Sequence, residues 1–417
     1  MNQPTPRELG YTFPAEWEPH DATWFSWPRP EGISFPGKYH TIPENLARLF
    51  REIAPRETVR INVPNDNYER IVRQQLREHG CPLRNIEFFH IRTNENWCRD
   101  HGPAFVVNRR RRGKARLAIV DWGFNAWGGK YPPFDDDDRV PTEIARILKL
   151  PVFYPLHRDD RGSIPSAVGY PSSIPSAVGY PSSIPSVGCP SLAGAAKASS
   201  DAPNTSKQVG WPSSAGPATK LVVMEGGAVD FNGAGTVLTT TDCLLNKNRN
   251  PGLTRSEIER YLLDFYGQRH VCWLTGGIAG DDTDGHVDDL ARFIGPTKIV
   301  IGIEPDPKDD NHRVLKSARR QLDKLRDQDG RAFEIVEIPM PHPVEHSGQR
   351  LPATYVNFYF VNGALLVPTY RDRRNDRRAL SILQEHLPRH KVIGIDCTEL
   401  IWGLGAIHCL SQQQPRA

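Results

Sequence analysis

The sequence lacks the features that mark membrane, secreted and nucleic-acid-binding proteins. No window holds 18 or more uninterrupted apolar residues, so we expect no transmembrane helix. Residues 1–20 show no basic start followed by an apolar core, so we expect no signal peptide. The formal net charge is only +3 over 417 residues, which argues against binding to nucleic acid or to a membrane surface.

Disulfide and zinc frameworks are missing as well. The chain has seven cysteines, an odd number, and they form neither a CxxC pair nor a dense cluster. This pattern is typical of reduced thiols in a cytosolic protein, and we therefore predict a cytoplasmic location. Zinc is poorly supported, because the His and Cys residues do not pair at the spacing of zinc ligands.

The chain does contain enough apolar side chains for a sizeable core. Hydrophobic residues make up 38% and charged residues 24% of the sequence, which is enough for one large domain or two ordinary ones. Its one basic run, Arg109 to Arg112, follows the strand-like stretch "FVVN". We expect this run to form a solvated hairpin tip.

A repeat interrupts the globular part of the chain. The sequence "SIPSAVGYPS" occurs twice in tandem from Ser163, a shortened copy follows, and the polar stretch continues to about Ala218. Its Pro-, Gly- and Ser-rich composition buries little apolar surface and resists helix formation. We therefore predict that residues 163–218 are a disordered insertion within a single domain over residues 1–417.

Outside this insertion one pattern recurs about five times. A polar cluster leads into a strand, a Gly or Asn turn and a second strand, and helical stretches lie between the copies. Turns are predicted at Asn232–Gly233, Gly295–Pro296 and Asn362–Gly363. The pattern favours a pseudo-symmetric α/β array whose polar clusters converge on one axis. Helices are predicted over residues 43–54, 66–79, 140–149, 254–266, 311–328 and 375–387.

The most acidic of these clusters is "GDDTDGHVDD", residues 280–289, in which five aspartates surround His286. It does not fit an EF-hand calcium loop, which needs acidic residues where glycine and alanine stand here. The D-x-H-x-D spacing of Asp284, His286 and Asp288 resembles a manganese-ligand motif of the arginase and agmatinase family. That family's other motifs are not found, so a manganese ureohydrolase is the weaker hypothesis. A pocket for a cation explains the acidic residues better.

Several clusters together resemble one family, the agmatine deiminases, also called bacterial-type peptidylarginine deiminases, of the guanidino-group-modifying superfamily. The similar stretches occur in the family's order and cover nearly the whole chain except the insertion. The resemblance implies an α/β propeller of five ββαβ blades around a pseudo-fivefold axis, the pentein fold, in one catalytic domain. The similar stretches are "FPAEWEPHDATWFSWP", "WCRDHGP", "WGFNAWGGKYPPFDDD", "EGGAVDFNGAGTVLTTTDCLLNKNRNP", "DDTDGHVDDLARF" and "GAIHCLSQQ".

The resemblance also implies the roles of individual residues. Cys409 would be the nucleophile, and His286 the general acid and base. Asp100 and Asp288 would bind the guanidinium nitrogens, and Glu225 would support His286 and the substrate. Paired carboxylates suit a guanidinium, because it is planar, permanently charged and offers forked N–H donors. Deimination would then run through an amidino-cysteine intermediate, without a metal or an organic cofactor.

Other residues near these motifs have open or structural interpretations. Trp97 is a candidate pocket wall, since an indole face attracts cations, and a core tryptophan is an equal alternative. We expect Trp122 and Trp127 to be packing residues and Cys98 to be structural. The acidic run at 134–139, "FDDDDR", is expected to be a solvated turn rather than a ligand for the far end of the substrate.

The resemblance favours a small cationic substrate, agmatine, with N-carbamoylputrescine and ammonia as products on the way to putrescine. Free arginine and peptidyl-arginine are the alternatives, since no residue is identified that binds the far end. A non-catalytic binding module on the same scaffold would be expected to lack the nucleophile or the base, yet Cys409 and His286 are both present. A homodimer is the default expectation for the assembly.

Overall fold

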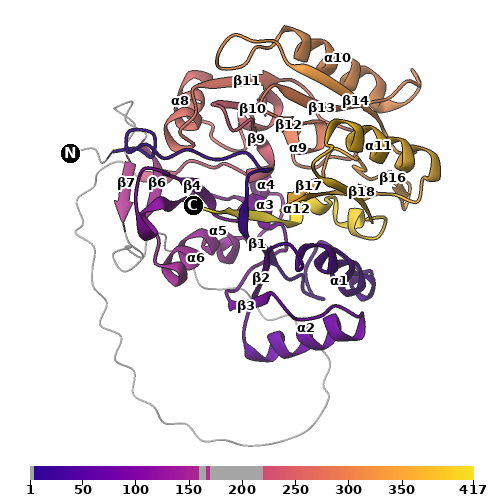
Figure 1. Cartoon of the computed structure of the whole chain (residues 1–417), viewed down its shortest axis with the longest axis horizontal. Helices are drawn as coiled ribbons and strands as arrows, with labels where there is room; N and C mark the ends of the chain where they lie inside the picture. Colours follow the sequence, from indigo (N-terminus) through magenta and orange to yellow (C-terminus); the bar gives the residue numbers. More distant parts are fainter. Residues whose placement is uncertain (1–3, 159–165, 170–218) are drawn as a thin grey trace, which may run out of the picture.

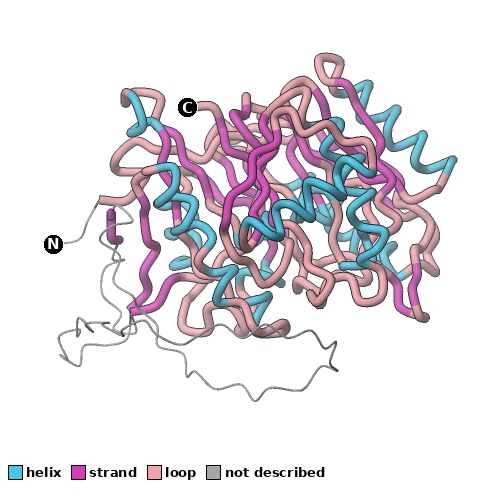
Figure 2. The backbone as a smooth tube through the Cα atoms, turned by 90° about the horizontal axis from the view of Figure 1, so that it is seen from below, coloured by secondary structure: helices cyan, strands magenta, loops and turns pink. Residues whose placement is uncertain are grey.

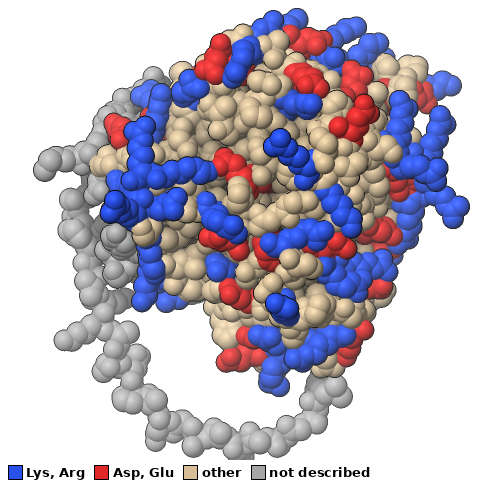
Figure 3. Space-filling model, viewed as in Figure 1, with Lys and Arg blue, Asp and Glu red and all other residues tan. Residues whose placement is uncertain are grey.

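The computed structural model describes residues 4–158, 166–169 and 219–417, in which helices and small sheets alternate along the chain (Figure 1). The long helices lie toward the periphery, and most strands lie toward the middle of the molecule (Figures 1 and 2). The predicted α/β class is therefore confirmed. On the face drawn in Figure 3, Lys and Arg side chains are interspersed with Asp and Glu over most of the surface.

Most sheets repeat one arrangement of two antiparallel strands, a helix, and a third strand parallel to the second. In one sheet β9 (Val229–Phe231) runs antiparallel to β10 (Thr236–Thr240), and β11 (His270–Leu274) lies parallel to β10 after α8 (Arg255–Phe265). A parallel neighbour requires such a crossover. Three more sheets follow this order: β4 (Ala104–Val107), β5 (Leu117–Val120), α6 (Val140–Leu148) and β6 (Val152–Arg158); β12 (Ala291–Gly295), β13 (Lys298–Ile303), α10 (Asp310–Lys324) and β14 (Glu334–Pro339); β17 (Tyr359–Val361), β18 (Ala364–Thr369), α11 (Arg373–His386) and β19 (Lys391–Asp396).

The fifth sheet joins the two ends of the chain. The C-terminal strand β20 (Gln412–Pro415) pairs antiparallel with β1 (His20–Ser26), and β2 (Thr58–Val63) lies parallel to β1. The partial last copy of the sequence pattern is thus completed by the first strand of the chain, as the adjacent yellow and indigo strands in Figure 1 show. Strand β3 (Ile86–His90) pairs with β2, and α1 (Ile42–Ile53) and α2 (Asp66–Glu78) lie between the strands in the sequence. A separate hairpin joins β15 (Glu345–His346) to β16 (Gln349–Arg350).

The predicted helices and turns are confirmed, with one shorter helix. Helix α10 buries Leu315, Ala318 and Leu322 at helical spacing, but it ends at Lys324 rather than at residue 328. The reason is Asp327, whose carboxylate accepts two backbone N–H groups farther along the chain and so closes a turn. At the predicted Asn362–Gly363 turn the glycine adopts a φ of +77°, a backbone conformation that side chains disfavour.

The basic run and the insertion have different outcomes. The exposed side chains of Arg109 to Arg112 lie at the tip between β4 and β5, as predicted. Disorder over 163–218 is a wrong prediction for Ser166–Gly169, which form β7 and pair with β6. An edge strand offers unpaired backbone groups, and β8 (Thr219–Leu221) also pairs with β6. Residues 163–165 and 170–218 lie outside the described part.

Short helical segments stand directly before the first strands of the sheets and bring the polar clusters together. Helix α3 contacts both α12 and η4, and η4 also contacts α9. Figure 1 places these segments near the middle of the molecule. Across the described ranges, no helix combines the length and apolar composition needed to cross a bilayer. The segments are α3 (Cys98–His101), η4 (Gly226–Ala228), α9 (Val287–Leu290) and α12 (Ile407–Leu410).

Candidate active site

The five predicted site residues converge where these short segments meet. The Nδ1 atom of His286 lies 3.7 Å from Oδ1 of Asp100 and 3.9 Å from Oδ1 of Asp288. The Sγ atom of Cys409 lies 3.8 Å from Oδ2 of Asp288. Ligand atoms of Glu225 and His286 lie within 4.8 Å of one another. All five side chains are buried, so a thiol, an imidazole and three carboxylates share one dry site.

Three buried polar atoms in this site make no hydrogen bond to any described residue. They are both ring nitrogens of His286 and Oδ1 of Asp288. Buried polar groups without partners are rare in folded proteins and need an explanation, such as a bound molecule. Their position beside Cys409 indicates that the site is built to receive a polar ligand.

The charges in the site are unbalanced toward the negative. Burial and the neighbouring carboxylates of Asp288 and Asp289 raise the pKa of the Cys409 thiol well above its usual range. Burial also raises the pKa of Asp100. Burial disfavours the charged form of His286, but Asp100 and Asp288 outweigh it and raise the pKa of this imidazole. A bound cation would lower the pKa values of Cys409, Asp100 and His286 again.

The glycine pair after Glu225 allows the segments to approach closely. The backbone N–H of Gly227 donates a 2.9 Å hydrogen bond to Oδ1 of Asp100. A Cβ atom on Gly227 would lie 2.5 Å from Nδ1 of His286 and 2.9 Å from Oδ1 of Asp100. Only glycine fits at position 227 without moving these side chains. The backbone of η4 therefore lies in close contact with His286 and Asp100.

Two residues of the site make contacts that the sequence did not indicate. Trp127 is buried and packs against Phe124 as expected, and its Nε1 also donates to Oδ2 of Asp100 at 3.0 Å. Asn357 was not recognised; its Nδ2 lies 3.1 Å from Sγ of Cys409 and 3.0 Å from Oδ1 of Asp289. Asn357 stands just before β17, where the other copies of the pattern carry their site residues, and that position was the available signal.

Glu225 is held by an arginine that the sequence did not single out. The Nε atom of Arg249 donates to Oε1 of Glu225 at 2.6 Å, and both side chains are fully buried. Arg249 also binds Asp284, which Lys130 contacts from the other side at 3.0 Å. Asp284 is therefore bound by two cationic side chains, which would compete with a metal ion for its carboxylate.

Trp97 lies beside Cys409. A Cβ atom on Gly405 would lie 2.6 Å from the Trp97 ring and 3.0 Å from Cβ of Cys409, so the indole and the cysteine flank this glycine. The Nε1 atom of Trp97 donates to Oγ of Ser34 at 2.9 Å, which fixes the plane of the ring. Trp97 is also buried in the hydrophobic core, so its position agrees with both interpretations, the core tryptophan and the pocket wall.

The remaining structural interpretations have mixed outcomes. Cys98 is buried, and burial raises the pKa of its thiol to about 12. The acidic run at 134–139 is not simply solvated, since Asp137 is buried and accepts the backbone N–H of Asn94 at 2.7 Å. Trp122 is buried and packs against Phe265, as expected.

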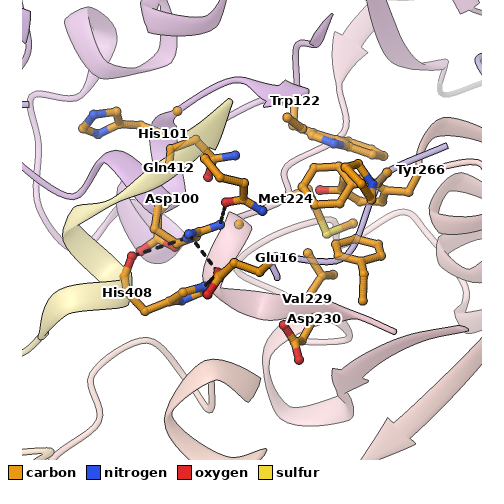
Figure 4. Close-up of a pocket in the computed structure, with 18 residues that line it drawn as sticks. Glu16, Asp100, His101, Trp122, Met224, Val229, Asp230, Tyr266, His408 and Gln412 are labelled. Atoms are coloured by element: carbon orange, nitrogen blue, oxygen red, sulfur yellow. Dashed lines mark hydrogen bonds and ion pairs between the residues drawn. The ribbon is translucent and has the colours of Figure 1, made fainter. Parts of the chain in front are cut away.

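A second layer of polar groups lies behind the site, around a small cavity (Figure 4). Glu16, from the segment before β1, contacts Arg99 at 3.3 Å and Arg292 at 3.0 Å. The ring of His408 lies between Glu16 and Asp288, with contacts of 2.8 Å and 2.6 Å. This layer connects the N-terminal segment to α12, the helix that carries Cys409.

Side chains that could hold a metal ion occur in three groups among the described residues. Glu225, Cys243 and His286 form one group within the site, and burial raises the pKa of the Cys243 thiol well above its usual range. A metal there would occupy the imidazole that lies beside Asp100 and Asp288. The other groups are Asp288 with Asp289 and Cys409, also in the site, and Asp66 with Glu69 and His90 at the surface.

The fold and the site define an α/β protein with a buried cysteine, histidine and carboxylate centre. The family profile described as Porphyromonas-type peptidyl-arginine deiminase matches residues 12–415. The chain belongs to this family of enzymes, and the family resemblance noted in the sequence is confirmed.

Similar proteins span the whole chain. Agmatine deiminase of Pseudomonas syringae pv. tomato is 32% identical over 99% of this chain and 97% of its own length. Agmatine deiminase of Pseudomonas aeruginosa is 32% identical over 100% and 99%. Among solved structures, agmatine deiminase of Enterococcus faecalis matches with a TM-score of 0.76 and 28% identity, covering 100% of this chain and 99% of that chain. A cysteine-to-serine variant of C. jejuni agmatine deiminase with substrate bound matches with a TM-score of 0.72 and 27% identity, covering 97% and 96%.

Proposed function

We propose that this enzyme hydrolyses the guanidinium group of agmatine, giving N-carbamoylputrescine and ammonia. The observation that carries the proposal is the position of Asp288. Its Oδ2 lies 3.8 Å from Sγ of Cys409, and its unpartnered Oδ1 lies 3.9 Å from Nδ1 of His286. A guanidinium that binds this carboxylate would have its carbon near the thiol and a nitrogen near the imidazole.

The first half of the reaction releases ammonia. Asp100 and Asp288 hold the guanidinium, whose positive charge lowers the pKa of the neighbouring Cys409 thiol. The thiol proton passes to His286, and the thiolate forms a bond to the guanidinium carbon. His286 donates a proton to one terminal nitrogen, the C–N bond breaks, and ammonia departs. An amidino group remains bound to Cys409.

The second half adds water. His286, now deprotonated, takes a proton from a water molecule, whose oxygen forms a bond to the amidino carbon. The C–S bond then breaks, and the ureido product leaves with the new oxygen. His286 returns its proton to the thiolate of Cys409, the hydroxyl proton of the product passes to solvent, and the starting state is restored. Splitting one difficult displacement into two easier ones is the advantage of the covalent intermediate.

Agmatine is preferred because relatives at 32% identity over nearly the full chain carry the name agmatine deiminase. Free arginine and peptidyl-arginine are the alternative substrates. A manganese ureohydrolase has less support, since Asp284 is bound by Arg249 and Lys130. Trp97 is proposed as a wall of the substrate pocket, where its ring would contact the cation.

We also infer that the five sheets are the five blades of an α/β propeller, arranged around a pseudo-fivefold axis at which the short segments meet. The recurring strand order supports this inference. In this proposal residues 1–417 form one catalytic domain, interrupted by the insertion at 163–218. A homodimer and a cytoplasmic location stay predictions.

A product assay on EDTA-treated protein tests the proposal. We expect ammonia and N-carbamoylputrescine from agmatine with the wild type and none with Cys409→Ser. Cys98→Ser is the matched control, because it removes another buried thiol outside the site, and it should retain activity. Release of urea that depends on added manganese, with Cys409→Ser still active, would contradict the proposal.

A further inference from the structure

His408, the residue directly before the nucleophile, is bound by two carboxylates from opposite sides. Its Nδ1 lies 2.6 Å from Oδ2 of Asp288, and its Nε2 lies 2.8 Å from Oε2 of Glu16. All three side chains are buried. Figure 4 shows His408 and Glu16 next to each other at the wall of the cavity behind the site.

The partners of His408 are held in their ionised form. Burial disfavours the charge on Glu16, but Arg292 and His408 outweigh it and lower the pKa of this carboxyl far below its usual range. Burial likewise works against Asp288, and the hydrogen bond from His408 overcomes it and lowers the pKa of Asp288. A ring nitrogen facing an ionised carboxylate at such distances must be a donor. Both ring nitrogens can donate at the same time only in the imidazolium form.

This arrangement separates the two oxygens of Asp288 by function. Oδ2 accepts the hydrogen bond from His408, whereas Oδ1 has no partner among the described residues and faces His286. Without His408, the carboxylate would be free to rotate about its last bond, and Oδ2 would lose its donor. The backbone of His408 is fixed as well, since its N–H donates to Oδ1 of Asn357 at 3.1 Å.

We propose that His408 is a positioning residue of the deimination reaction, whose imidazolium fixes Asp288 so that Oδ1 faces the guanidinium. Glu16 holds the ring from the other side and thereby couples the N-terminal segment to the site. The inference rests on the proposed function and extends it, because His408 acts through Asp288 and does not touch the substrate.

Two isosteric substitutions separate the two contacts. In His408→Asn the side-chain amide nitrogen stands where Nδ1 was, so the donor to Asp288 is kept. In His408→Gln it stands where Nε2 was, so only the contact to Glu16 is kept. We expect kcat/KM to fall by less than about 10-fold in His408→Asn, the loss of a single hydrogen bond. It should fall by about 100-fold in His408→Gln, where Asp288 is misplaced.

His20→Gln is the matched control. His20 is also buried between a carboxylate and a carbonyl, with Nδ1 3.0 Å from Glu57 and Nε2 2.7 Å from the backbone oxygen of Glu16, but it does not contact Asp288. The His20→Gln substitution should change the melting temperature without changing kcat/KM. Equal losses of kcat/KM in both His408 variants, or a loss of kcat/KM of the same size in His20→Gln, would overturn the inference.

The pH profile adds a readout that a merely structural role would not move. Because His408 lowers the pKa of Asp288, its removal should shift the acid limb of kcat/KM to higher pH. Should His408→Gln fail to fold, Glu16→Gln should shift the limb in the same direction, and an unshifted limb would refute the positioning role. The charged and titratable groups around Asp288 are His408, His286, Cys409, Asp289, Asp100 and Arg292.

Labelling of Cys409 distinguishes failure of this inference from failure of the proposed function. A cationic haloacetamidine requires Asp288 to align its amidinium, whereas neutral iodoacetamide does not. We expect His408→Gln to slow the cationic reagent about 10-fold more than the neutral one, the effect of one misaligned charge-assisted contact. The ratio of the two labelling rates can be measured without turnover. It therefore tests the role of His408 even if the wild type turns over no guanidino compound. An unchanged ratio would overturn the inference.

Discussion

The indole Nε1 of Trp127 donates a hydrogen bond of 3.0 Å to Oδ2 of Asp100. The other oxygen of Asp100 accepts the backbone N–H of Gly227 at 2.9 Å. Both donors are neutral, so they fix the direction of the carboxylate without compensating its charge. The negative charge of Asp100 is therefore left for a cationic ligand, which fits the role proposed for this residue.

Trp127→Phe should weaken substrate binding. Phenylalanine keeps an aromatic ring but removes the N–H group, which leaves Oδ2 of Asp100 without its donor. We expect KM for agmatine to rise and kcat/KM to fall by about 10-fold, the effect of one hydrogen bond to a charged group. Trp273→Phe is the matched control, because its indole also donates to a carboxylate, that of Glu259, outside the site. A similar loss in both variants would argue against a specific role of Trp127.

Asn357 should stabilise the thiolate of the nucleophile. Its Nδ2 lies 3.1 Å from Sγ of Cys409. Asn357→Ala removes this donor and should lower kcat about 10- to 100-fold, as expected for a hydrogen bond to a charged group. Asn357→Asp places a carboxylate against the sulfur and should be worse than the alanine variant. Steady-state kinetics would check the order, and an aspartate variant more active than the alanine variant would contradict it.

Gly227→Ala should lower kcat about 100-fold while the protein still folds. The added methyl group would lie 2.5 Å from Nδ1 of His286, so the imidazole must move out of its position in the site. A displacement of about 1 Å in an active site costs roughly 100-fold in rate. Gly252→Ala, where the nearest contact is 3.4 Å, should leave kcat unchanged. Steady-state kinetics would measure the activity of both variants, and circular dichroism would check that both are folded. Full activity of Gly227→Ala would contradict the prediction, because it would show that the site tolerates the displacement.

The pH dependence of Cys409 reactivity follows from its surroundings. Burial and the carboxylates of Asp288 and Asp289 raise the pKa of this thiol well above its usual range, so the thiol is protonated at neutral pH in the free enzyme. The rate of alkylation by neutral iodoacetamide should therefore keep rising with pH through pH 9, since only the thiolate reacts. A plateau below pH 7 would mean that the free enzyme already holds a thiolate.

The buried pair of Arg249 and Glu225 should matter for stability. Both side chains are fully buried, and removing one partner leaves an uncompensated charge. Arg249→Met should lower the free energy of unfolding by about 3–5 kcal/mol, and Arg249→Met combined with Glu225→Gln should restore part of it. Chemical denaturation at pH 7 would measure both. A double variant no more stable than the single one would show that packing, not charge, accounts for the loss.

The sequence predicted the fold to a large extent because its signals are local. Turn dipeptides such as Asn362–Gly363 and the helical spacing of Leu315, Ala318 and Leu322 depend on neighbouring residues alone. The convergence of polar clusters was predictable for the same reason, since each cluster precedes a hairpin. Asn357 was accessible to this reasoning and was missed because a single amide carries no motif.

The second layer of the site could not be read from the sequence. Glu16 and His408 are 392 positions apart and meet only because β1 and β20 pair. Arg249 and Glu225 likewise meet through the packing of a loop that has no periodic pattern. The role of Trp127 depends on the direction of one ring nitrogen, and residue type alone does not indicate it.

The most direct test of the account is to trap the intermediate. The enzyme would be mixed with agmatine, quenched with acid within the first turnovers, digested and analysed by mass spectrometry. We predict that the peptide containing Cys409 gains the mass of agmatine less ammonia, and that Cys409→Ser gains none. Turnover of agmatine with unmodified Cys409, under conditions in which the quench preserves thiouronium adducts, would contradict the covalent mechanism.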